Sequence, residues 1–176
     1  LSIVPLRAEA AHRSEMVSQL LFGECFEVLE ESADWAYIKT ETDNYEGWLQ
    51  LGQFTYVTAE EYNSCHSSKR LLVGPSGAYA VSGFVRIQLV HGTYVYPGQD
   101  NTMKVGKVAY NIEGDVFAPD TGSFETEIAV VSRAYEAVPY LWGGRSRAGI
   151  DCSGFSQLIY RHFNLKLPRD AYQQAE

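Results

Sequence analysis

The segment Tyr140-Leu141-Trp142-Gly143-Gly144, followed after a gap of six residues by Asp151-Cys152-Ser153-Gly154-Phe155, decides how this chain is interpreted. Asp151 or Cys152 opens a predicted helix, because the residues behind it recur at helical spacing: Phe155, Leu158, Ile159, His162 and Phe163. A cysteine in the first turn of a helix has its thiolate stabilised by the helix dipole and by free N–H groups. The pattern therefore predicts a nucleophilic Cys152, whose backbone N–H can contribute to an oxyanion site. A buried structural cysteine is the alternative.

A second helix is predicted upstream of this segment. Ser123 is placed to cap it, Pro139 marks its end, and its apolar side consists of Ile128, Val131, Tyr135 and Val138. Residues 118–123 are rich in turn formers, so we place a domain boundary there and treat residues 123–176 as one unit.

The first two thirds of the chain are predicted to be β-rich. Turn residues separate short strands over 20–24, 26–30, 35–40 and 46–51, which is a small-barrel pattern across residues 1–57. Thr58 stands three residues before Glu61, a capping-box spacing that predicts a short helical turn in a connector, 58–70. A second β module is predicted over 71–122, with strands at 84–90, 92–96, 103–107 and 108–112.

Composition excludes several classes of protein. The 176 residues carry 14 Lys and Arg against 22 Asp and Glu, a net charge of −8, which argues against a dedicated nucleic-acid binder. No stretch approaches the roughly 20 apolar residues of a membrane span. Three widely spaced cysteines fit neither a disulfide framework nor a zinc knuckle, and we see no metal-ligand cluster, so we predict no metal and no cofactor.

Three motifs in the last fifty residues carry a family resemblance. The stretches 140–144 and 151–155, together with Leu167-Pro168-Arg169-Asp170-Ala171-Tyr172-Gln173-Gln174, resemble the start of the NlpC family, papain-like cysteine peptidases that cut bacterial cell-wall peptides. Features of residues 1–57, among them Gly23-Glu24 and 43–48, look like a bacterial SH3-like domain. The resemblance implies an α+β protein: one or two small SH3-like β-barrels, the second over 71–122, followed by the helical N-terminal half of a papain-like domain.

The resemblance also implies an activity. Cys152 would attack the scissile carbonyl and form an acyl-enzyme that water releases. Similar proteins cleave between γ-D-glutamate and the diamino acid of peptidoglycan stem peptides that begin with an unblocked L-Ala. Substrate-binding residues implied in this way are Asp151, Ser153, Tyr140, Trp142, Tyr45 and Glu15. Asp151 would meet the ammonium of L-Ala, while Tyr45 and Glu15 would bring the first SH3-like domain to the same end of the substrate.

Each of these residues also has a purely structural interpretation. Tyr45 is equally consistent with a turn aromatic, Glu15 with a solvated charge, Asp151 with a helix N-cap and Trp142 with core filling. Arg169 and Gln173 match the third motif, and we assign them only structural or supporting roles.

A papain-like thiolate needs a downstream histidine and a residue to orient it, and neither is recognisable in the sequence. His162 lies on the apolar stripe of the Cys152 helix and is interpreted as a packed residue, while His12, His66 and His91 precede Cys152 and receive no catalytic role. The two helices after residue 123 also have no sheet of their own to cover their apolar faces. We therefore expect the N-terminal part of a longer peptidase that is inactive without its C-terminal half.

Two other functions remain open. A non-catalytic protein that binds cell-wall peptides through its β modules would explain the missing histidine, and an amidase or acyltransferase would share Cys152 but need another acyl pocket. We expect a bacterial cell-envelope location, periplasmic or secreted, with cytoplasmic recycling of wall fragments as the alternative.

Overall fold

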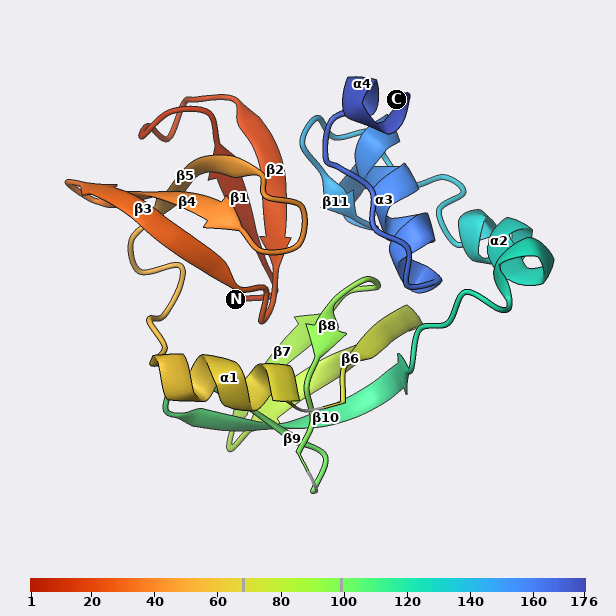
Figure 1. Ribbon diagram of the computed structural model, residues 1–176, viewed down its shortest axis with the longest axis horizontal. Helices are drawn as coiled ribbons and strands as arrows, with labels where there is room; N and C mark the ends of the chain where they lie inside the picture. The colour runs from red at the N-terminus through yellow and green to blue at the C-terminus, as the bar shows by residue number, and fades with distance from the viewer. Residues whose placement is uncertain (68, 99) are drawn as a thin grey trace.

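The structure of the chain is a computed structural model that describes residues 1–67, 69–98 and 100–176, without the side chains of 64–67. Three parts lie around a common junction: an N-terminal sheet, a central sheet and a C-terminal helical segment (Figure 1). No helix in the described ranges has the length and apolar character needed to cross a membrane.

The N-terminal sheet contains β1 (Ile3–Arg7), β2 (Met16–Leu21), β3 (Phe26–Ser32), β4 (Trp35–Thr40) and β5 (Glu46–Gln50) in the antiparallel order β2-β1-β5-β4-β3. Its core is formed by Val4, Leu6, Leu20, Ala36, Ile38 and Leu49. The edge strands β2 and β3 are not hydrogen-bonded to each other, so the predicted closed barrel is not shown. The sequence patterns missed β1 and placed β2 four residues too late, since the chain turns at Gly23 (φ 74°).

The connector contains α1 (Ala59–Ser67), which begins at the predicted capping box. Glu61 N–H donates to Thr58 Oγ1 at 3.1 Å, and Thr58 N–H donates to Glu61 Oε2 at 2.7 Å. Residue 68, near the end of the predicted connector, lies outside the described residues.

The central sheet contains β6 (Leu71–Ser82), β7 (Val85–Leu89), β8 (Tyr94–Val95), β9 (Thr102–Val105) and β10 (Val108–Phe117). Its order is β7-β6-β10-β9, with β8 paired to β6, so this path is also open rather than a shown barrel. The sequence patterns missed the long β6, whose residues Val73, Ala78 and Ala80 are buried in the core of this sheet.

The helical segment contains α2 (Phe124–Arg133), β11 (Arg145–Ser146), β12 (Gly149–Ile150), α3 (Cys152–His162) and α4 (Ala171–Gln174). Both long helices were predicted from periodicity, but the Ser123 side chain makes no capping hydrogen bond, and α2 ends before the predicted Pro139. The β11–β12 pair and α4 were not predicted, because elements of two to four residues carry no usable period.

Three successive residues at the end of β2 join the three parts. Leu20 is buried in the core of the N-terminal sheet, Leu21 in the core of the helical segment, and Phe22 in the core of the central sheet. The N-terminal sheet is therefore packed against both other parts, which brings residues from it to the first turn of α3. The domain boundaries drawn from the sequence stay a prediction.

Candidate active site

Cys152 is the first residue of α3, and its side chain is exposed. It lines a cavity of about 350 Å³ between the N-terminal sheet and the helical segment. The sheet contributes Glu15, Val17 and Tyr45 to this cavity, and the helical segment contributes Trp142, Asp151, Ser153 and residues of the third motif. Of the predicted site residues only Tyr140 is not among those that line it; Tyr140 is exposed and its backbone pairs with Ile150.

Asp151 is the N-cap of α3 and fixes the loop in front of Cys152. Its Oδ1 accepts from Gly154 N–H at 2.7 Å, and its Oδ2 accepts from Gly143 N–H at 2.9 Å. Arg169 Nη2 donates to Oδ2 at 2.7 Å and Nη1 donates to Oδ1 at 3.2 Å. Burial by itself would raise the pKa of Asp151, but Arg169 and the two N–H groups lower it below its usual value. The carboxylate is thus ionised, with both oxygens engaged by protein donors.

The glycines of the first two motifs are required by close backbone packing. Gly143 has φ 75°, and a Cβ there would lie 2.3 Å from the carbonyl oxygen of Met16 in β2. A Cβ on Gly154 would lie 2.3 Å from the carbonyl oxygen of Gly144. Only glycine lets the loop lie directly on β2 and on the first turn of α3.

Arg169 connects α3 to the N-terminal sheet. Its side chain is buried, its Nη1 donates to Ser153 Oγ at 2.6 Å, and its Nε donates to Ser18 Oγ of β2 at 3.1 Å. Arg169 has the supporting role predicted for it, and the hydroxyl of Ser153 is held by its guanidinium.

Two further hydrogen bonds cross the cavity between the sheet and the helical segment. Tyr45 Oη donates to Asp170 Oδ1 at 3.0 Å, and Trp142 Nε1 donates to Glu15 Oε1 at 2.5 Å. Burial and the Asp170 carboxylate raise the pKa of Tyr45. Asp170 was not predicted as a site residue. In the structure it forms a capping box with Gln173 at the start of α4, and this three-residue spacing is the local signal that could have drawn attention to it.

None of the three histidines whose side chains are described lines the cavity. His91 Nε2 lies 3.0 Å from His162 Nδ1, and His91 Nδ1 lies 2.7 Å from Tyr135 Oη, in a buried cluster at the far end of α3. His162 is ten residues after Cys152 on the same helix, which separates the two along the helix axis by roughly 15 Å. The ring of His12 packs edge-on against Trp35, and the side chain of His66 is outside the described part.

A search of the described residues finds no group of three or more His, Cys, Asp or Glu arranged to hold a metal ion. Within the cavity the acidic side chains are Glu15, Asp151 and Asp170, and the basic one is Arg169. Because Arg169 is paired with Asp151, the remaining carboxylates make this cavity suited to a cationic group beside a thiol.

Comparisons with known proteins match both ends of the chain. Residues 6–54 match the family model described as "Bacterial dipeptidyl-peptidase Sh3 domain", and residues 137–176 match the "NlpC/P60 family". The chain is 26% identical to dipeptidyl-peptidase 6 of Lysinibacillus sphaericus over 94% of this chain and 69% of that protein. It is 27% identical to the gamma-D-glutamyl-L-lysine dipeptidyl-peptidase of Bacillus subtilis over 90% of this chain and 57% of that protein.

The fold has a close counterpart among solved structures. The crystal structure of an NlpC/P60 family protein from Bacillus cereus superposes with a TM-score of 0.83 at 18% identity, covering 98% of this chain and 74% of that one. The chain spans little more than half the length of the Bacillus subtilis dipeptidyl-peptidase and of its Bacillus cereus counterpart, 57% and 55% respectively.

Proposed function

We propose that this protein is a hydrolase of cell-wall peptides, because the chain joins a segment that matches a bacterial SH3 domain to a segment that matches the NlpC/P60 family. Its proposed substrates are stem peptides with a free N-terminal L-Ala, cut between γ-D-glutamate and the diamino acid. The observation that carries the proposal is the exposed Cys152 at the start of α3, facing a cavity whose opposite wall holds Glu15 and Tyr45.

The proposed reaction begins with attack of the Cys152 thiolate on the γ-glutamyl carbonyl carbon. The amine of the diamino acid leaves with a proton, and water then hydrolyses the thioester. N–H groups in the first helical turn have no carbonyl partner within the helix. Asp151 takes the N–H of Gly154, and we assign the N–H of Cys152 to the developing oxyanion.

The proposal also requires a general base beside Cys152. His91 and His162 are bonded to each other at the other end of α3, so neither is this base. We propose that an imidazole outside residues 1–176 supplies it in the whole protein. By this account residues 1–176 alone bind the peptide and do not hydrolyse it.

The amino end of the substrate is proposed to lie between Glu15 and Asp170. The sequence analysis gave the ammonium contact to Asp151, and Asp151 remains a proposed wall of the pocket. Because its two oxygens are engaged by Arg169 and two backbone N–H groups, the direct ammonium contact is better supported for Glu15 and Asp170. Both carboxylates line the cavity, and Tyr45 adds a hydroxyl to the same wall.

The remaining predicted residues have proposed supporting contacts. Trp142 is 58% exposed and offers an indole face to the apolar atoms of the peptide, while its N–H orients Glu15. Ser153 is proposed to act through Arg169 rather than through a free hydroxyl. Tyr140 lies outside the cavity lining, so we propose it only for substrate groups that extend beyond the cavity.

The experiment compares L-Ala-γ-D-Glu-L-Lys with its N-acetyl form as substrates of the whole protein. An acylated amine has no charge and leaves the carboxylates of Glu15 and Asp170 without a cationic partner, so we expect cleavage of the free peptide to be at least about 100-fold faster. The double variant E15Q/D170N should lose most of this preference. Equal hydrolysis of both forms by the unaltered protein would remove the proposed amino-end pocket.

Binding of the free peptide without any hydrolysis by the whole protein would instead favour the non-catalytic binding protein.

The location remains a proposal, with the cell envelope and cytoplasmic recycling both suited to such a substrate. Fractionation of the source cell followed by immunodetection of the protein would decide between them.

A further inference from the structure

Gln157 of α3 holds together two segments that are distant in the sequence. Its Nε2 donates to Asp43 Oδ2 at 2.8 Å and to the carbonyl oxygen of Leu167 at 3.0 Å. The residue is 3% exposed, so these two bonds form away from competing water. Asp43 belongs to the turn between β4 and β5, and Leu167 opens the third motif.

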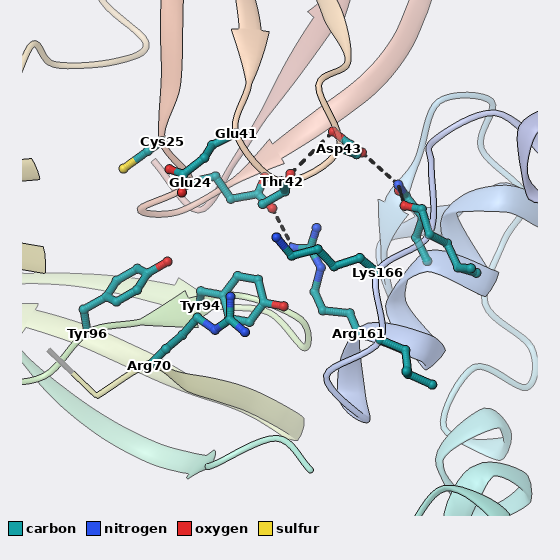
Figure 2. A pocket seen from close by; sticks show the side chains of 13 residues that line it. Glu24, Cys25, Glu41, Thr42, Asp43, Arg70, Tyr94, Tyr96, Arg161 and Lys166 are labelled. Atoms are coloured by element: carbon teal, nitrogen blue, oxygen red, sulfur yellow. Dashed lines mark hydrogen bonds and ion pairs between the residues drawn. The ribbon is translucent and has the colours of Figure 1, made fainter. Parts of the chain in front are cut away.

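The Asp43 bond fixes the turn that carries Tyr45. Thr40 Oγ1 donates to Asp43 Oδ1 at 2.5 Å and accepts from Tyr45 N–H at 2.8 Å. The turn also needs Asn44 in the left-handed region at φ 56°. Asp43 points from this turn toward α3, above the cavity at the junction of the three parts (Figure 2). A shift of Asp43 therefore moves the backbone of Tyr45.

The Leu167 bond fixes the other side of the same contact. Two residues after Leu167, Arg169 is bound to Asp151, and the next residue, Asp170, accepts the hydroxyl hydrogen of Tyr45 at 3.0 Å. The two segments held by Gln157 thus meet again as the Tyr45–Asp170 pair at the cavity beside Cys152.

The amide oxygen of Gln157 gains no interaction from its position, so it does not explain why a polar side chain occupies this site. Gln157 Oε1 is buried and has no hydrogen-bond partner among the described residues. A buried acceptor without a partner lowers stability, and an apolar side chain of similar size would avoid that cost. The two bonds donated by Nε2 are what an apolar replacement would lose.

We infer that Gln157 is a positioning residue that sets the Tyr45–Asp170 pair for recognition of the substrate's amino end. It lines the junction cavity and is not among the residues that line the cavity at Cys152, so it acts through Tyr45 and Asp170. The identity of the ligand in this inference rests on the proposed function. The statement that Gln157 holds the 41–45 and 167–170 segments in place does not.

The binding test uses the whole protein with Cys152→Ala, so that L-Ala-γ-D-Glu-L-Lys is not consumed during titration calorimetry. Gln157→Leu should weaken binding about tenfold, the effect of a lost pair of buried hydrogen bonds. Gln88→Leu, the same replacement at an exposed position of β7, should leave the dissociation constant unchanged. In a Tyr45→Phe/Asp170→Asn background, Gln157→Leu should change binding less than twofold. An equal loss in both backgrounds, or no loss in the first, would overturn the inference.

Two measurements separate positioning from damage to the helix. The first measurement keeps Cys152 and compares the Gln157→Leu variant with the unaltered protein. Iodoacetamide should alkylate Cys152 at the same rate in both. Amide hydrogen exchange should become faster over residues 41–45 and 167–170 and stay unchanged over 158–162. A slower alkylation, or faster exchange along α3 alone, would contradict the positioning role.

The exchange experiment needs no ligand, so it distinguishes two failures. If the unaltered protein binds no tripeptide, the proposed function fails while exchange still decides whether Gln157 holds the two segments. If the tripeptide binds and exchange does not change, the positioning role fails alone.

Discussion

Replacing Glu24 with Gln tests what holds the three parts of the molecule together. The Glu24 side chain is 3% exposed, and its Oε1 lies 2.6 Å from Arg161 Nη1 and 3.2 Å from Arg145 Nη2. Arg145 belongs to β11, seven residues before Cys152. Arg161 belongs to α3 and also donates to the carbonyl oxygen of Gly92 at 3.1 Å. The Glu24 carboxylate therefore links the N-terminal sheet to the helical segment, and Arg161 extends this link to the central sheet. Figure 2 shows the bond between Glu24 and Arg161.

The magnitude follows from the burial of the two arginines, whose side chains are 1% and 7% exposed. Burial would raise the pKa of Glu24, but Arg145 and Arg161 lower it below its usual value, so the carboxylate is ionised at neutral pH. A glutamine there removes the carboxylate that forms ion pairs with both buried guanidinium groups. Breaking a buried ion pair in this way costs about 3–5 kcal/mol of unfolding free energy.

The assay is urea unfolding at pH 7, followed by fluorescence and by circular dichroism. The matched control is Glu113→Gln, because Glu113 forms an exposed ion pair with Arg86 at 3.2 Å. The Arg86 side chain is 55% exposed and the Glu113 side chain is 44% exposed. We expect the control to lose about 0–1 kcal/mol. A loss in Glu24→Gln no larger than in the control would refute the reasoning that this cluster joins the three parts.

Two further predictions concern the free energy of unfolding at acid pH and the backbone at Gly143. Burial lowers the pKa of His91 to about 3, and burial also lowers the pKa of His162. The stability that these neutral rings contribute is therefore complete above about pH 6.5 and is lost as the pH falls, by up to about 1.4 kcal/mol per pH unit for His91. His91→Gln should flatten this decline in unfolding measured between pH 7 and 4, and an unchanged slope would exclude His91 as its source. Gly143→Ala should cost at least about 2 kcal/mol, from its positive φ and the Met16 carbonyl. Gly52→Ala, with φ 86° and no atom within 4 Å of the added Cβ, isolates the φ contribution, and equal losses in the two variants would mean that β2 does not constrain the loop.

Local patterns predicted the parts of the site that lie close together in the sequence. The period after Cys152 predicted α3 with Asp151 or Cys152 at its start. The structural interpretation of Asp151 as a helix N-cap is confirmed by the hydrogen bond from Gly154. The family resemblance is shown by the matches at both ends of the chain. The start of α3 and its N-cap could be predicted because they depend on residues within one or two helical turns of each other.

The contacts that complete the site could not be predicted in this way. Tyr45 and Asp170 are 125 residues apart, and Glu24 and Arg161 are 137 apart. Glu24 was placed at the end of a predicted strand, 20–24, and nothing local indicates that its carboxylate is buried between two arginines. The sheets were interpreted as barrels because strand length and alternation do not determine whether the edge strands pair.

The measurement that tests the central claim most directly is release of L-lysine from L-Ala-γ-D-Glu-L-Lys by the whole protein and by its Cys152→Ala variant. The proposal that Cys152 is the nucleophile rests on its place at the start of α3 and on the cavity in front of it. We predict that the unaltered protein releases lysine and that the variant releases none above the uncatalysed rate, while still binding the tripeptide. Lysine release by the variant at the rate of the unaltered protein would contradict the account.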